Sequence, residues 1–233
     1  MNDNKHSNIV IQTKGLSKIY EAAVPVHAVN NVDFKVKRGE FSALVGPSGS
    51  GKTTLLNLIG GLDTPTEGTV IIDNTDISKL SKNALIDFRL RNIGFVFQAY
   101  NLIPVLTARE NIEFVMLLQK ESAKDRKERV DFLLNEVEMY EEADRKPSEL
   151  SGGQQQRVAV ARALASKPQF VLADEPTANL DSRTAGKLLD MMLRLNDDEN
   201  MTFIFSTHDQ RVIDRARRVI TLVDGSIASD VTN

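Results

Sequence analysis

Eight residues near the start of the chain have the types and spacing of a phosphate-binding loop. They read Gly46-Pro47-Ser48-Gly49-Ser50-Gly51-Lys52-Thr53 and match every fixed position of the pattern G-x-x-x-x-G-K-[ST]. The glycines let the backbone wrap around an anion, so that its N–H groups point inward and the following helix adds its positive dipole end. Lys52 can reach the β- and γ-phosphates, and the Thr53 hydroxyl can bind a bridging Mg²⁺. The sequence therefore predicts a site for a nucleoside triphosphate and Mg²⁺.

Two carboxylates follow an apolar segment further along the chain. Residues 170–173 are typical of a buried strand, and Asp174 and Glu175 come directly after them. Ligands of open α/β sheets bind at the carboxyl ends of strands, so we expect both side chains at the site. Asp174 is the natural partner of Mg²⁺, and Glu175 can deprotonate the water that attacks the γ-phosphate. The alternative is a pair that only caps the next helix, which the phosphate-binding loop in the same chain disfavours.

A second anion-binding helix start is predicted at Leu150-Ser151-Gly152-Gly153-Gln154, where a serine and two glycines precede a helix. One chain has no obvious use for two phosphate sites, whereas two chains can share them. Together the three motifs resemble the nucleotide-binding subunit of an ATP-binding cassette (ABC) transporter, whose signature reads LSGGQ as here. The resemblance extends from about residue 9 to residue 227.

The resemblance implies roles for three further residues. Tyr20 matches the aromatic residue that stacks on adenine, Gln98 the glutamine that senses Mg²⁺ and the γ-phosphate, and His208 the histidine that contacts the γ-phosphate. Without that context, Tyr20 is also compatible with a surface position on an edge strand. His6 and His27 have no comparable context, and we assign them no role.

The family also implies a head-to-tail dimer that binds ATP between the loop of one subunit and the signature of the other. In the family, the loop before the next helix often has the sequence SALD. This chain keeps Asp181 but reads Ala178-Asn179 before Leu180, so the finer contacts of this loop across the dimer are not carried over from the family. The implied ATP-binding residues are Tyr20, Gly46, Pro47, Ser48, Gly49, Ser50, Gly51, Lys52, Thr53, Thr54, Ser151, Gly152, Gly153, Gln154 and Asp181. The implied catalytic residues are Glu175, His208, Gln98 and Lys52, and the implied metal-binding residues are Thr53, Gln98 and Asp174.

Residues 57–63 and 94–104 narrow the resemblance to ATPases of the lipoprotein-releasing and macrolide-export type. Such subunits are ATPases of the cytoplasm, held on the inner face of the cell membrane by a separate permease. Export or extraction of a lipoprotein, macrolide or peptide is the implied function. The alternatives are a non-transport ABC ATPase and a small-molecule kinase with a phosphate-binding loop, although a kinase does not need the signature or the Asp174-Glu175 pair.

Composition limits the class of protein. The chain has 233 residues, 41% of them hydrophobic, which suffices for one sizeable core or two unequal lobes. Lys and Arg total 29 against 32 Asp and Glu, and this balance argues against a nucleic-acid partner. The absence of cysteine excludes disulfides and a thiol nucleophile. No run approaches ~18 apolar residues and residues 1–7 are polar, so we expect neither a membrane span nor an export signal.

The elements that position these residues alternate between strands and helices, which predicts an α/β fold with a mainly parallel sheet. Expected strands cover residues 32–36, 41–45, 69–73, 93–97, 170–173 and 201–205. Expected helices cover residues 54–59, 107–120, 130–137, 154–165 and 184–195, with another after His208 and a final hairpin at Asp224-Gly225. We therefore predict a single ABC ATPase domain with a P-loop NTPase core and an N-terminal antiparallel β subdomain, about 1–98 and 157–233. A helical subdomain is inserted at about 99–156.

The apolar cluster that precedes the capping box at Thr107 is a candidate surface for the permease. Its residues are Tyr100, Leu102, Ile103, Val105 and Leu106. Such a cluster is too apolar for a solvated loop, which favours a docking site. The alternative is that these side chains pack beneath the helical insertion.

Overall fold

The computed structural model describes residues 8–21 and 23–232. Its strands are β1 (Ile9–Tyr20), β2 (Val26–Lys37), β3 (Phe41–Val45), β4 (Glu67–Ile72), β5 (Thr75–Asp76), β6 (Ile93–Phe97), β7 (Phe170–Asp174), β8 (Thr202–Ser206), β9 (Arg218–Val223) and β10 (Ser226–Thr232). Its helices are α1 (Lys52–Ile59), α2 (Lys82–Asn92), α3 (Ala108–Leu118), α4 (Ala123–Glu136), α5 (Gly152–Ala165), α6 (Ser182–Glu199) and α7 (Gln210–Ile213), with 3-10 turns at Ile77–Lys79 and Pro147–Glu149.

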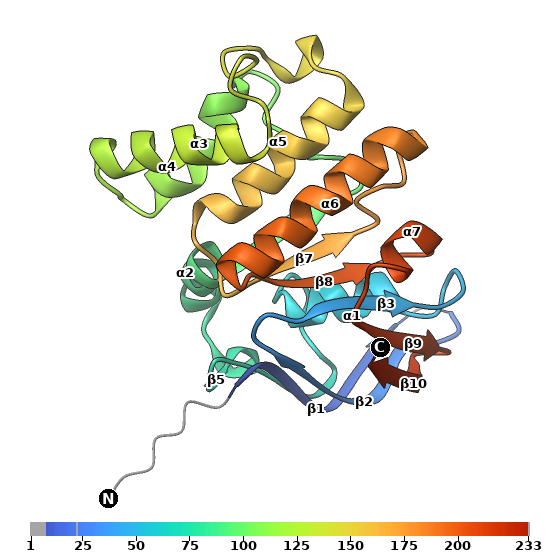
Figure 1. Ribbon diagram of the computed structural model, residues 1–233. Helices are drawn as coiled ribbons and strands as arrows, with labels where there is room; N and C mark the ends of the chain where they lie inside the picture. Colours follow the sequence, from blue (N-terminus) through green and yellow to red (C-terminus); the bar gives the residue numbers. More distant parts are fainter. Residues whose placement is uncertain (1–7, 22, 233) are drawn as a thin grey trace, which may run out of the picture.

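The larger sheet has the strand order β10-β9-β3-β8-β7-β6 (Figure 1). Neighbours from β9 to β6 are parallel and β10 is antiparallel, which confirms the predicted α/β fold with a mainly parallel sheet. The strands β3, β7 and β8 have five residues each and are almost entirely buried, as apolar strands covered on both faces should be. Their carboxyl ends lie at one edge, where the phosphate-binding loop, Asp174 and His208 follow.

The smaller sheet is antiparallel, with the order β2-β1-β4-β5. In β2 the predicted alternation is confirmed, because Val32, Phe34 and Val36 are buried and the residues between them are exposed. Helix α1 lies between the two sheets and contributes four buried side chains, among them Leu55 and Ile59, to the core that they share. This helix therefore fixes the phosphate-binding loop to both sheets.

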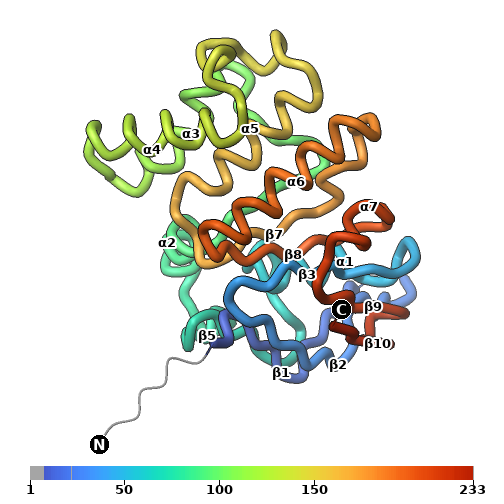
Figure 2. The backbone as a smooth tube through the Cα atoms, viewed as in Figure 1, coloured from blue at the N-terminus to red at the C-terminus, as the bar shows by residue number. Residues whose placement is uncertain are grey.

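Helices α3, α4 and α5 lie together at the end of the molecule opposite the smaller sheet (Figures 1 and 2). With α6 they pack around the second apolar core, which also takes residues from β6, β7 and β8. The segment between β6 and β7 contains α3, α4 and α5, and no strand occurs among these described residues. The signature begins α5 and is thus held by helices rather than by the sheet.

Several element boundaries differ from the prediction for identifiable reasons. Helix α5 begins at Gly152 rather than Gln154, because Ser151 caps it and exchanges hydrogen bonds of 2.9 and 3.3 Å with Gln154. The strand predicted at 69–73 is β4, which ends at Ile72 because Asp73 adopts a positive φ of 44°. Helix α6 continues to Glu199, four residues beyond the predicted end.

Two of the longer elements, β1 and α2, were not predicted, and neither was the short strand β5. Strand β1 has repeated register shifts against β2 and an irregular burial pattern, so its sequence lacks a period of two. Helix α2 has no fully buried residue, and only Leu85 and Phe88 pack partly against the core, so its sequence has no pronounced apolar stripe.

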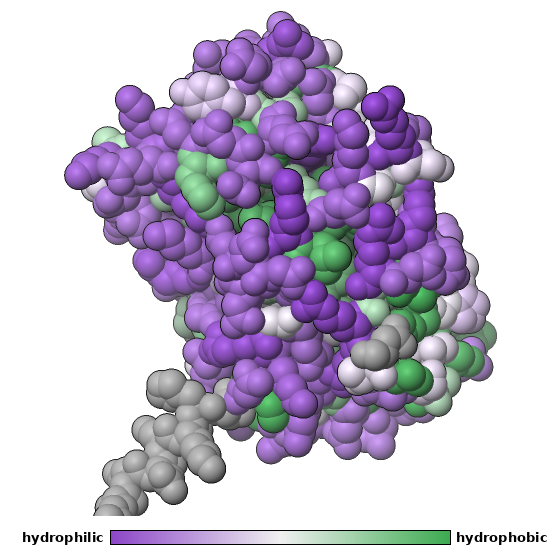
Figure 3. Space-filling model, viewed as in Figure 1, coloured by the Kyte–Doolittle hydropathy of each residue, from purple (hydrophilic) through white to green (hydrophobic). Residues whose placement is uncertain are grey.

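The described helices include none that is long and apolar enough to cross a bilayer. The face shown in Figure 3 is largely hydrophilic, with hydrophobic side chains gathered around the end formed by β9 and β10.

Candidate functional site

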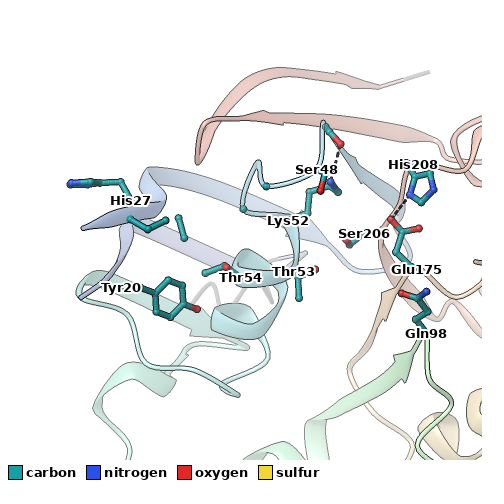
Figure 4. A pocket seen from close by; sticks show the side chains of 15 residues that line it. Tyr20, His27, Ser48, Lys52, Thr53, Thr54, Gln98, Glu175, Ser206 and His208 are labelled. Atoms are coloured by element: carbon teal, nitrogen blue, oxygen red, sulfur yellow. Dashed lines mark hydrogen bonds and ion pairs between the residues drawn. The ribbon is translucent and has the colours of Figure 1, made fainter. Parts of the chain in front are cut away.

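A cleft of about 760 Å³ opens at the carboxyl edge of the larger sheet. Its lining residues are Tyr20, Val26, His27, Ala28, Gly46, Ser48, Gly49, Gly51, Lys52, Thr53, Thr54, Gln98, Glu175, Ser206 and His208. Figure 4 shows Tyr20 at one end, Glu175 and His208 at the other, and Lys52 with Thr53 between them. The cleft thus brings together residues that are up to 188 positions apart in the chain, counted from Tyr20 to His208.

The phosphate-binding loop takes a shape that requires glycine. Gly51 has a φ of 97°, and a Cβ there would lie 2.0 Å from the carbonyl oxygen of Ala28. Gly49 has a φ of 79° and open space around it, so the loop has room there for an anion to approach its backbone. The loop leads directly into α1, whose N-terminus adds partial positive charge.

Lys52 and Thr53 are the two residues of the loop that the sequence predicts to bind phosphate and Mg²⁺. The Lys52 ammonium donates hydrogen bonds of 2.8 and 3.0 Å to the carbonyl oxygens of Gly46 and Pro47, and its third N–H is available to a ligand. The Thr53 hydroxyl lies 3.2 and 3.1 Å from the two carboxylate oxygens of Asp174. Hydroxyl and carboxylate oxygens therefore lie together at the end of β7, at the place for which the sequence predicts a metal site.

Glu175 and His208 meet at the far end of the cleft. The Glu175 Oε1 atom lies 2.7 Å from His208 Nδ1, and Oε2 accepts a hydrogen bond of 3.3 Å from the Thr207 hydroxyl. The backbone N–H of Glu175 donates to the Ser206 carbonyl oxygen, and Glu175 has a positive φ of 47°. These contacts hold the carboxylate at the junction of β7 and β8, where it can accept a proton from a water molecule.

Gln98 follows β6 and lines the same end of the cleft. Its backbone carbonyl oxygen accepts a hydrogen bond of 3.0 Å from Asn179 Nδ2. Asn179 is one of the two residues, with Ala178, at which the loop before Asp181 departs from the family pattern, and here it makes a contact within the subunit. The departure thus ties this loop to the segment that begins the helical insertion.

Tyr20 lines the opposite end of the cleft, where its side chain remains 40% exposed. Thr54 lies beside it on α1 (Figure 4). His27, which has no role in the sequence analysis, also lines this end, although its ring points away from Lys52 in Figure 4. No sequence motif identifies His27, because only the pairing of β2 with β1 brings it next to Ile19. His6 lies outside the described residues.

The signature residues and Asp181 do not line the cleft. Ser151 caps α5, and Asp181 caps α6 by accepting hydrogen bonds of 3.0 and 3.1 Å from the backbone N–H groups of Arg183 and Thr184. A Cβ on Gly153 would lie 2.3 Å from Thr184 Cγ2, so close packing of α5 on α6 requires this glycine. The predicted ATP-binding residues therefore form two separate groups in one chain.

Asp209 anchors the segment that carries His208. It accepts hydrogen bonds from Arg211 (2.7 to 3.1 Å) and a bond of 2.6 Å from the Thr177 hydroxyl. The hydrogen bonds from Arg211 lower the pKa of Asp209 from 3.8 to about 2. Burial acts in the opposite direction, and the hydrogen bond from Thr177 lowers the pKa further. Because the folded pKa is below the unfolded one, this stabilisation is complete above about pH 4 and is lost as the pH falls towards 2.

We expect Asp209→Asn to reduce the free energy of unfolding at pH 7 by about 1 kcal/mol, after allowance for solvent screening. The difference from the parent protein should shrink between pH 4 and pH 2 in urea titrations. Asp190→Asn is the control, since Asp190 pairs with Arg215 at the exposed surface. An equal loss at pH 7 and pH 2.5 for Asp209→Asn would contradict the assignment.

Comparisons with known proteins relate the chain to one family. A family model described as "ABC transporter" matches residues 29–178. The uncharacterized ABC transporter ATP-binding protein MJ0796 of Methanocaldococcus jannaschii is 45% identical over 94% of this chain and 95% of its own length. The lipoprotein-releasing system ATP-binding protein LolD of Legionella pneumophila is 42% identical over 95% of this chain and 98% of its own. A dimeric post-hydrolysis structure of MJ0796, bound to ADP and Pi, matches with a TM-score of 0.88 and 43% identity over 95% of this chain and 98% of that chain.

Proposed function

This chain belongs to the ABC transporter family, and from that premise we propose that two copies of it hydrolyse ATP to drive a separate membrane permease. The observation that carries the residue assignments is the single cleft that holds Lys52, Thr53, Glu175 and His208 while the signature lies outside it. Tyr20 at one end fits the base, and the loop between fits the phosphates, so the γ-phosphate reaches Glu175 and His208.

In this arrangement the chain's own groups divide the work of hydrolysis. Lys52 and the loop N–H groups neutralise the phosphates, and Glu175 accepts a proton from the attacking water. His208, held against Glu175 at 2.7 Å, keeps that carboxylate in place and lies close to the γ-phosphate position. Gln98 lines the same end and can respond to the state of the γ-phosphate.

Mg²⁺ fits the oxygen atoms at this site. Thr53 supplies a hydroxyl and Asp174 a carboxylate, within hydrogen-bonding distance of each other. In such sites Mg²⁺ binds one or two carboxylates together with water and substrate phosphates. We propose that these two residues hold the ion, with Gln98 nearby. The ion would neutralise charge on the β- and γ-phosphates.

A second copy of the chain completes the site in our proposal. The signature offers a capped helix start that suits an anion, yet in the same chain it is separate from the cleft. In a head-to-tail pair, the signature of each subunit would cover the phosphates bound by the other subunit. The dimer would then have two identical ATP sites. The dimeric structure of MJ0796 gives a relative with this stoichiometry.

The permease needs a surface, and the apolar cluster before Thr107 is one candidate. Leu102 packs partly against the helical core, as the packing alternative anticipated, whereas Val105 is 72% exposed. A more extensive apolar groove of about 380 Å³ lies between α2, β6 and α3, and its apolar lining residues include Leu62, Ile86, Leu90, Phe95, Phe97 and Val115. We propose that this groove receives a short apolar helix of the permease, because β6 leads from the groove directly to Gln98.

We expect Ile86→Glu to leave folding and basal ATP hydrolysis intact and to abolish co-purification of the permease from detergent-solubilised membranes. Ile86 is 49% exposed and lines the groove, so the charge costs little in the free subunit but cannot be buried under a partner. Val231→Glu, at an exposed position on β10, is the control and should retain the permease. If the Ile86→Glu variant still co-purified with the permease and the Val105→Glu variant did not, the docking surface would lie on the loop before α3.

The likeness to the lipoprotein-releasing protein LolD leads us to propose a permease that extracts or exports a lipid-linked or amphiphilic substrate. The chain would then lie at the cytoplasmic face of the cell membrane through this permease. We further propose that about 99–156 acts as one helical subdomain, hinged after Gln98. Identification of the co-purified permease tests the proposed kind of permease and the proposed location at the membrane. We expect this permease to have a large extracytoplasmic domain.

A further inference from the structure

Tyr20 is fixed by a polar cluster that no sequence motif reveals. Its hydroxyl donates a hydrogen bond of 2.8 Å to Asp63 Oδ2, and the Lys18 ammonium donates one of 2.7 Å to Asp63 Oδ1. Lys18 also donates to the carbonyl oxygen of Thr64 at 2.8 Å. We call Lys18, Tyr20 and Asp63 the tyrosine clamp. It joins the end of β1 to the loop that follows α1, the helix that begins at the phosphate-binding loop.

The clamp makes the two faces of the Tyr20 ring different. The Lys18 ammonium lies over the ring, 4.9 Å from its centroid, and the Lys18 side chain is itself largely buried. Tyr20 as a whole residue is nevertheless 40% exposed, and it lines the cleft together with Thr54. One face is therefore covered by a cation, and the exposed part of the ring faces the cleft.

The charges of the clamp suit a site for an anionic nucleotide. Although burial favours the neutral acid, hydrogen bonds from Lys18 and Tyr20 hold the pKa of Asp63 below its usual range. Burial, and the hydrogen bond to Asp63, raise the pKa of Tyr20, so the phenol remains a donor at neutral pH. Lys18 balances the Asp63 charge, and the clamp adds no net negative charge near the phosphates.

We propose that Asp63 and Lys18 are positioning residues for the nucleobase: they hold the Tyr20 ring so that its free face receives the base of ATP. The inference rests on the proposed role of Tyr20 in the site. Neither positioning residue lines the cleft, and among the described residues no hydrogen bond or ion pair joins either of them to Lys52, Thr53 or Glu175. We therefore expect them to affect binding of the base alone. An ordered ring loses less conformational entropy when a base stacks on it, and this is how the clamp raises affinity.

The test separates base binding from phosphate binding. Mg-ATP affinity and KM are measured alongside inhibition by inorganic tripolyphosphate, which has no base. We expect Asp63→Ala to raise the Kd and KM for ATP about threefold to tenfold, a part of the full stacking contribution, with kcat within about twofold. The inhibition constant of tripolyphosphate should not change. Asp63→Glu, which keeps a carboxylate, should restore part of the ATP affinity.

Tyr20→Phe tests the clamp from its other side, since it keeps the ring and removes the hydroxyl. It should reproduce the effect of Asp63→Ala, and the double variant should be no worse than either single one, because both remove the same contact. Asp73→Ala is the matched control. It breaks an ion pair of the same length, with Arg38, outside the cleft, and should leave both ligands unaffected.

The outcomes distinguish this inference from the function on which it rests. If Tyr20→Ala weakens ATP but Asp63→Ala does not, the clamp has no positioning role and the inference is overturned while the role of Tyr20 stands. If Asp63→Ala weakens tripolyphosphate as much as ATP, Asp63 supports the phosphate-binding loop and the inference is also overturned. If Tyr20→Ala leaves ATP affinity unchanged, the base does not stack on Tyr20, and both the inference and that assignment fail.

Discussion

Replacement of Glu175 by glutamine is expected to lower ATP turnover by about 10²–10⁴-fold while nucleotide binding is retained. The amide has the shape of the carboxylate, so the contacts with Thr207 and His208 at the end of the cleft can largely persist. It has no basic oxygen that could take a proton from the attacking water. Single-turnover hydrolysis and nucleotide binding, measured on the same preparation, check the two parts of this expectation separately.

Lys52→Ala provides the contrasting variant. Lys52 contacts the loop carbonyl oxygens and points into the cleft, so its loss should weaken the nucleotide interaction itself. His208→Ala should reduce turnover because Glu175 loses its 2.7 Å partner, although the base remains. Turnover at the parental rate by Glu175→Gln would show that another group accepts the proton.

Elements of the fold could be predicted from the sequence wherever a local pattern is compatible with only one kind of secondary structure. The apolar strands β3, β6 and β7, the capping box at Thr107 and the hairpin at Asp224-Gly225 are of this kind, and each lies where it was expected. The structure also brings Lys52, Glu175 and His208 into one cleft, in agreement with the rule that ligands bind at the carboxyl ends of parallel strands.

The features that escaped prediction depend on contacts between distant segments or on weak local patterns. Asp63 meets Tyr20 across 43 positions, and nothing in the sequence around either residue specifies this hydrogen bond. His27 reaches the cleft through strand pairing alone. Strand β1 is irregular, and α2 lacks a buried stripe, so neither has the periodicity from which elements are read.

The docking surface illustrates the same limit. Five apolar residues before Thr107 indicated an interaction site, yet exposure could not be derived from their types. Leu102 is partly buried against the helical core, whereas Ile86, on a helix that the sequence did not predict, lines an apolar groove.

The strongest test of the two-copy site is complementation between two inactive variants. Lys52→Ala disables the phosphate-binding loop but leaves the signature intact. Ser151→Asp does the reverse: aspartate is as good a helix cap as serine, so α5 should keep its start, while a negative charge now faces the incoming phosphates. Each variant alone should have almost no ATPase activity, since every composite site in its dimer has one defective half.

A mixture of the two variants should recover activity. In a mixed dimer one site combines both defects, and the other combines an intact loop with an intact signature. Random pairing makes half of the dimers mixed, so recovery of up to about a quarter of the parental rate is expected where the two sites act independently. Ser151→Asn, a neutral cap, is the control and should keep most activity alone. A mixture of Lys52→Ala and Ser151→Asp that stays inactive, although mixed dimers form by light scattering or cross-linking, would contradict a site shared between subunits.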